Sequence, residues 1–191
     1  MHRLSVNGAT PAPPVRLARV NHVLATQRLV LRPVEAADHA ALLAHWTAPD
    51  VREFLFDGEV LSPSAISGVI EESTRDFASA GYGLWLVFEG PIDSQNGAAR
   101  LIGTTGLRPL EDLGLEVLYS LTAAARGKGY ATEAAGAVLG YALGTLGLPQ
   151  VFAEVDEGNR ASQAVLTRLG MTPFDVVPGV LGPMTRYRRA R

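Results

Sequence analysis

The sequence predicts a single α/β domain, and three observations lead to this fold class. Residues 113–121 are apolar with one embedded charge, as expected of a β-strand, and residues 151–155 form a second strand. Between them, apolar residues recur every three or four positions over 131–146, the spacing of a helix with one buried face. A chain of 191 residues with 47% hydrophobic content has the size and core of one domain.

The remaining elements follow from the same patterns. They are, in order, a helix opening at Asp38, a strand over 84–88, a polar hairpin loop over 90–99 that leads to a strand starting at Leu101, and a short helix from Asn159 to Gly170. Residues 1–25 hold three prolines and few bulky apolar groups. We therefore expect residues 1–25 to be a flexible extension and residues 26–191 to be the domain.

The helix over 131–146 carries a line of glycines. Gly136, Gly140 and Gly144 share one face, and each glycine costs a helix about 1 kcal/mol relative to alanine. This cost predicts a close packing contact of the helix against the sheet. Gly147 is the expected C-cap.

Composition excludes several classes of function. A formal charge of −2 argues against an extended nucleic-acid surface, and the lack of cysteine removes thiol catalysis, disulfides and cysteine-based metal sites. His39 and His45 are off the i, i+4 spacing of a helical metal pair. No apolar run is long enough for a membrane span or a signal peptide, so we expect a cytoplasmic protein, monomeric or homodimeric, with no metal, nucleic-acid or membrane partner.

Residues 126–134 join a glycine-bearing turn to the start of a helix. Gly127 and Gly129 let the backbone approach an anion closely, and the unpaired N–H groups of the first helical turn favour an oxyanion. The turn is not a Walker loop, because Lys128 is followed by glycine. It is not a dinucleotide fingerprint, because Thr132 stands where the third glycine belongs.

The remaining pattern, Arg-x-x-Gly-x-Ala from Arg126 to Ala131, resembles the pyrophosphate loop of the GNAT superfamily of N-acetyltransferases. The segment 159–171 is similar to that family's second cofactor motif, with Met171 in place of the usual phenylalanine. Residues 26–33, 101–107 and 115–121 resemble strands of its ribosomal-protein N-terminal (RimJ/RimL-type) branch. The landmarks occur in the family's order from Thr26 to the C-terminus.

The resemblance implies a mixed, mainly antiparallel sheet with a splay between its fourth and fifth strands. It implies acetyl-CoA as the cosubstrate and direct transfer, in a ternary complex, to a primary amine of a protein N-terminus or a small molecule. It assigns cofactor binding to strand, loop and helix-cap residues, namely Leu118, Tyr119, Ser120, Arg126, Gly127, Lys128, Gly129, Tyr130, Ala131, Thr132 and Asn159.

Acetyl transfer also needs a base and a proton donor for the thiolate. Glu116 is the candidate base, because a carboxylate within an apolar strand is desolvated and its pKa rises; the alternative is a surface or salt-bridged glutamate. Many family members use a tyrosine as the acid, but Leu166 occupies that position. Ser162 is the nearest substitute, unless its hydroxyl is satisfied within the first helical turn.

Two questions stay open at this level. The missing tyrosine is compatible with a non-catalytic acyl-CoA-binding or sensing protein as the alternative function. The region 49–81 is acidic, with Glu53, Asp57, Glu59, Glu71 and Glu72, which suits a cationic amine acceptor or simply a solvated helical face.

Overall fold

The computed structural model describes residues 22–90, 100–111 and 113–191. The strands form one eight-stranded sheet in the order β1-β2-β3-β4-β5-β6-β8-β7, antiparallel except for the parallel pair β5 and β6. They are β1 (Leu24–Ala25), β2 (Leu29–Pro33), β3 (Leu84–Glu89), β4 (Arg100–Leu110), β5 (Gly114–Leu121), β6 (Gln150–Asp156), β7 (Thr172–Gly179) and β8 (Gly182–Ala190). The predicted α/β fold with a mixed, mainly antiparallel sheet is confirmed.

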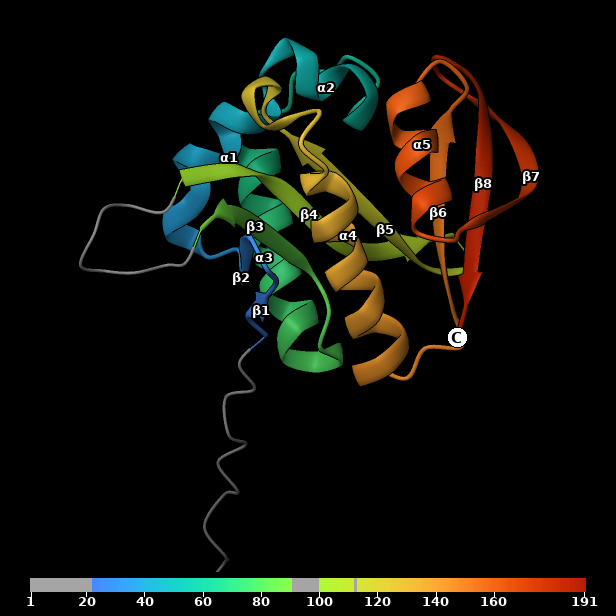
Figure 1. The fold of residues 1–191 in the computed structure, drawn as a ribbon. Helices are drawn as coiled ribbons and strands as arrows, with labels where there is room; N and C mark the ends of the chain where they lie inside the picture. The colour runs from blue at the N-terminus through green and yellow to red at the C-terminus, as the bar shows by residue number, and fades with distance from the viewer. Residues whose placement is uncertain (1–21, 91–99, 112) are drawn as a thin grey trace, which may run out of the picture.

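Helices cover both faces of this sheet. They are α1 (His39–Trp46), α2 (Pro49–Leu55), α3 (Pro63–Ala80), α4 (Tyr130–Gly140) and α5 (Arg160–Arg168), with short 3-10 turns at Ala36–Asp38 and Ala123–Ala125. The side chains of β3 are buried on both faces of the sheet, because a layer of helices covers each face. Leu84 and Leu86 pack with α1 and α3, whereas Trp85 and Val87 pack with α4. Figure 1 shows α3 and α4 on opposite faces of the strands.

The helix predicted over 131–146 is only partly regular. Helix α4 ends at Gly140 and continues as a π-helix over Tyr141–Thr145, while Gly147 takes the expected left-handed conformation with φ 68°. The π turn places the hydroxyl of Tyr141 2.7 Å from the carbonyl of Gly81, to which it donates. This contact is tertiary, so the local apolar period did not predict it.

The predicted packing of the glycine line against the sheet is wrong. A Cβ built on Gly140 or Gly144 would meet no heavy atom of the described residues within 4 Å. A Cβ on Gly136 would meet Leu169 of the α5 side at 3.3 Å. Only Gly136 therefore makes a close contact, and it is with a neighbouring helix end.

Two of the predicted segments, the N-terminal extension and one loop, lie largely outside the described residues. The predicted extension over 1–25 falls outside the described residues up to residue 21, but Leu24 and Ala25 pair with β2, so the sheet begins before residue 26. Most of the predicted loop over 90–99 also lies outside the described residues. Over the described ranges, no helix combines the length and apolar content that a membrane span requires.

The parallel pair β5 and β6 opens the sheet. The two strands are in register at a single position, where Glu116 pairs with Phe152, and they diverge beyond it. On β5, Val117 and Leu121 belong to the core under α4, so Glu116, Leu118 and Ser120 point to the opposite face. The same alternation on β6 places Asp156 on the face of Glu116.

Candidate active site

A cleft of about 980 Å³ occupies the opening between β5 and β6. Its walls come from β5, β6, the turn before α4, the first turns of α4 and α5, and α2. Of the residues predicted to bind the cofactor, all except Lys128 line this cleft, and so do Glu116 and Ser162. The fold thus brings together residues that are up to 46 positions apart, from Glu116 to Ser162.

The glycine turn at the mouth of the cleft has free backbone donors. Gly127 and Gly129 have φ of 74° and 81°, a left-handed conformation that residues with a Cβ rarely adopt. Within the described chain, no protein acceptor binds the amides of residues 127–132; the first helical bond runs from Glu133 to Gly129. Five of these six residues, all except Lys128, line the cleft, so unpaired N–H groups of a helix start border it. Such an arrangement suits a phosphate.

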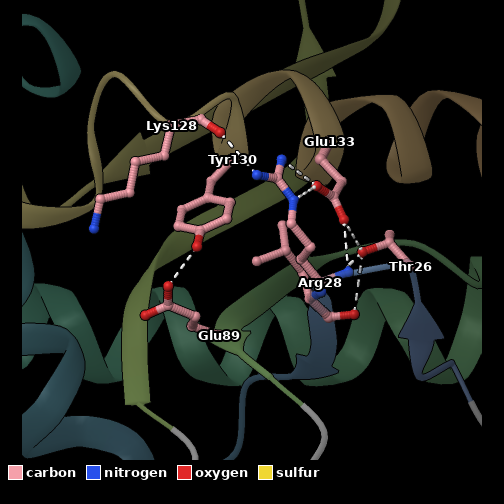
Figure 2. A network of polar contacts seen from close by, with 7 residues as sticks. Thr26, Arg28, Glu89, Lys128, Tyr130 and Glu133 are labelled. Carbon is pink, nitrogen blue, oxygen red and sulfur yellow. Dashed lines mark hydrogen bonds and ion pairs between the residues drawn. The ribbon is translucent and has the colours of Figure 1, made fainter.

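Arg28 holds this turn from the side, and the sequence analysis did not identify it. Its Nε and backbone N–H donate to the Glu133 carboxylate at 2.7 and 2.9 Å, and its Nη1 donates to the carbonyl of Lys128 at 2.9 Å. Figure 2 shows the guanidinium between these two groups, beside the ring of Tyr130. Thr26 donates to the same carboxylate at 2.6 Å. The network fixes the turn and neutralises Glu133 in the first turn of α4.

The two cations of the turn, Arg126 and Lys128, differ in where their side chains lie. Arg126 forms an ion pair with Asp50 of α2 at 3.0 Å and donates to the carbonyl of Leu121. The ammonium of Lys128 points away from the Arg28 network (Figure 2) and does not line the cleft. Arg126 therefore ties the turn to α2.

The hydroxyls of Tyr119 and Ser162 meet across the cleft. Their oxygens lie 2.7 Å apart, and Tyr119 also approaches the carbonyl of Ser162 at 3.3 Å. Burial raises the pKa of Tyr119 to about 12, so this phenol stays protonated at neutral pH. Tyr119 was expected only to line the thioester or pack, and its contact with Ser162 is a tertiary one.

Asn159 and Leu166 bear on the predicted chemistry of α5. The side-chain oxygen of Asn159 accepts the amide of Ser162 at 3.1 Å and so caps the helix, which leaves its NH₂ group available. Leu166 is fully buried in the core. No side-chain hydroxyl is therefore present at the position where related enzymes carry the tyrosine.

Glu116 is buried and ion-paired. Its side chain is 5% exposed, and Arg108 Nε lies 2.6 Å from its Oε1. Burial raises the pKa of Glu116, while the charge and hydrogen bond of Arg108 oppose that rise. The structure thus combines the desolvation expected of a base with the salt bridge that was the alternative.

A buried histidine lies behind Ser120. The Nε2 of His45 on α1 is 2.9 Å from the Ser120 hydroxyl, which is 2.8 Å from the hydroxyl of Thr104. Burial lowers the pKa of His45 to about 4, so the ring is neutral at pH 7. Its Nδ1 has no hydrogen-bond partner among the described residues.

Asp156, at the end of β6, is a further carboxylate on the face of Glu116, and the sequence analysis gave it no role. It is 6% exposed and lines the cleft, and its Oδ1 has no hydrogen-bond partner in the described part of the chain. Burial raises the pKa of Asp156, and the charge of Asp57 adds to the rise. The sequence signal was present, since an acidic residue ends an apolar strand just before the Asn159 cap.

Known structures share this fold. An acetyltransferase from Agrobacterium tumefaciens str. C58 matches over 100% of both chains with 27% identity and a TM-score of 0.73. A putative ribosomal-protein-serine acetyltransferase from Vibrio cholerae matches with 18% identity and a TM-score of 0.67, covering 88% of this chain and 97% of that one. RimL, a ribosomal L7/L12 alpha-N-protein acetyltransferase solved with coenzyme A, matches with 16% identity and a TM-score of 0.72, covering 88% and 97%.

The sequence itself assigns the family. The model of the acetyltransferase (GNAT) domain matches residues 28–172, which include the glycine turn, the splayed strands and the whole segment 159–171. The chain therefore belongs to the GNAT family of acetyltransferases and is an N-acetyltransferase with acetyl-CoA as its cosubstrate.

Proposed function

We propose that this protein transfers the acetyl group of acetyl-CoA directly to a primary amine, at a peptide N-terminus or on a small molecule, within a ternary complex. The observation that carries the proposal is the opening between β5 and β6. Carboxylates line one face of that opening and two hydroxyls line the other. An amine and a thioester that meet there would have a base and an acid on opposite sides.

The donor would bind along the α4 side. The free amides of residues 127–132 would hold the pyrophosphate, and the strand residues Leu118, Tyr119 and Ser120 would run beside the pantetheine. The NH₂ group of Asn159 would donate to a pantetheine carbonyl. RimL, which shares this fold, was solved in complex with coenzyme A.

The reaction then follows from the groups at the opening. Glu116 would accept a proton from the ammonium, directly or through water, and the free amine would attack the thioester carbonyl. Backbone N–H groups of β5 would stabilise the oxyanion. As the C–S bond breaks, the Ser162 hydroxyl would donate a proton to the thiolate and recover one from Tyr119 at 2.7 Å. The adduct nitrogen would lose its remaining extra proton, and water would carry that proton back to the Tyr119 phenol, so the step ends with the amide, the free thiol and one proton on Glu116.

The test separates donor binding from turnover. Calorimetry should detect acetyl-CoA binding, and thiol release should rise above background with at least one amine from a panel of Ser- and Ala-terminated peptides, spermidine and an aminoglycoside. Binding without thiol release across the panel would favour the acyl-CoA sensor, which the buried Leu166 keeps as the competing function. Loss of both signals would reject the cofactor assignment.

A further inference from the structure

Among the described residues, Asp156 is the buried carboxylate of the cleft that has no ion pair. Six carboxylates line the cleft, and four of the others each hold an arginine: Asp50 with Arg126, Glu116 with Arg108, Glu133 with Arg28 and Glu154 with Arg186. The fifth, Glu53, is exposed to solvent. Asp156 is 6% exposed and has no ion pair within the described residues. A buried carboxylate without a cation is destabilising, so its presence points to a partner outside the chain.

The position of Asp156 places that partner at the reaction centre. Glu116 pairs with Phe152 in the parallel register. Ser120 and Asp156 each lie four residues further along their strands, so they are at the same level. Asp156 therefore lies across the splay from Ser120, whose neighbour His45 is uncharged. Tyr119 and Ser162, the hydroxyls facing the donor side, meet at the same level of β5.

We propose that Asp156 binds the ammonium group of the acceptor, and that the acceptor is therefore an aliphatic amine that is cationic before it reacts. The inference rests on the proposed acetyl transfer and adds the residue that selects the substrate. An ammonium supplies the hydrogen bonds that Oδ1 lacks. Asp57, on the turn after α2, adds a second negative charge to this environment, which favours a cation over a neutral or anionic acceptor.

Asp156 and Glu116 would then have different tasks. Glu116 lies at the closed end of the splay and is held by Arg108, whereas Asp156 lies level with the widened part. Removal of the Asp156 charge should weaken binding of the amine and leave donor binding intact. The glycine turn that holds acetyl-CoA belongs to α4, on the other face of the sheet.

The test is Asp156→Asn, an isosteric change, with Glu157→Gln as the matched control on the adjacent exposed carboxylate. Steady-state kinetics would use spermidine and a Ser-terminated peptide at saturating acetyl-CoA, and calorimetry would follow acetyl-CoA binding. Asp156→Asn should raise KM for these amines on the order of 10- to 100-fold, the loss expected for a charged hydrogen bond. Its acetyl-CoA Kd and the constants of Glu157→Gln should stay within about twofold of wild type.

A structural role would give the opposite pattern. It would lower the melting temperature of Asp156→Asn, whereas an unpaired carboxylate held for a ligand gives an unchanged or raised melting temperature when neutralised. An amine KM within about twofold of wild type, or an acetyl-CoA Kd that rises in parallel, would overturn the inference. Failure of every amine to react while acetyl-CoA still binds would instead reject the proposed transfer, and failure of acetyl-CoA to bind would reject the cofactor assignment.

Discussion

The hydroxyl oxygens of Tyr119 and Ser162 lie 2.7 Å apart, and this hydrogen bond connects two elements on either side of the opening between β5 and β6. Tyr119 belongs to β5 and Ser162 to the first turn of α5, beyond the end of β6. The contact gives Ser162 a protonated neighbour, which a serine needs if it is to pass a proton to a departing thiolate.

We therefore expect Ser162→Ala and Tyr119→Phe to lower kcat with little change in KM for acetyl-CoA. Loss of the acid should cost about tenfold or more in kcat for Ser162→Ala, and less for Tyr119→Phe. Because the two hydroxyls act in series, the double variant should be no slower than Ser162→Ala alone. Steady-state kinetics of the four proteins checks this, and an unchanged rate for Ser162→Ala would dismiss the acid role.

The glycine turn gives a binding prediction with a matched control. Gly129→Glu should abolish the acetyl-CoA signal in calorimetry, because a carboxylate would repel the pyrophosphate. Gly147→Glu is the control, since Gly147 has a similar φ of 68° but does not line the cleft. Both changes should cost about 1–2 kcal/mol of backbone strain. Retained acetyl-CoA affinity in Gly129→Glu would contradict the placement of the phosphate.

Arg28 should support the same site by neutralising Glu133. Arg28→Gln leaves the Glu133 carboxylate unpaired in the first turn of α4, next to the free amides, so acetyl-CoA should bind roughly tenfold more weakly. The double variant Arg28→Gln with Glu133→Gln removes that charge and should recover most of the affinity. Calorimetry of both variants checks the charge effect; a double variant that stays as weak as the single one would assign Arg28 a purely structural role.

The ion pair between Glu116 and Arg108 predicts how kcat/KM changes with pH. The positive charge of Arg108 favours the ionised carboxylate, so Arg108→Gln should raise the pKa of Glu116 further. The acid limb of kcat/KM should then move to higher pH, because the base must be deprotonated to act. In Glu116→Gln this limb should disappear and the rate should fall. A Glu116→Gln enzyme with the wild-type rate and profile would remove Glu116 as the base.

His45 predicts a loss of stability in acid. Its pKa is about 4 in the folded protein and 6.5 in the ordinary reference, so below pH 6.5 the unfolded chain binds a proton that the native chain does not. The free energy of unfolding should therefore fall as the pH drops from 6.5 to about 4, by roughly 3 kcal/mol for this group. His45→Gln should flatten this part of the curve. Urea unfolding across the range, with His39→Gln as a control at a half-buried histidine, measures the difference.

The sequence determined the local elements and the identity of the donor. The strands β5 and β6, the helix start at Tyr130 and the caps at Asn159 and Gly147 lie where their patterns predicted them. Such features depend on neighbours within a few residues, through apolar spacing, side-chain caps and glycine conformation. For the same reason, the glycine turn was recognisable from nine consecutive residues.

Tertiary structure decided which side chains meet around the cleft. The pairs Arg28–Glu133, Arg108–Glu116 and Tyr119–Ser162 join different elements, and no local pattern signals them. The π turn after α4 and the open face of Gly140 and Gly144 also depend on distant neighbours. Asp156 is the clearest example. The sequence shows that an aspartate is present, but only the folded structure shows that this carboxylate is buried and has no ion pair with another described residue. Desolvation and ion pairing arise only when the chain brings remote residues together.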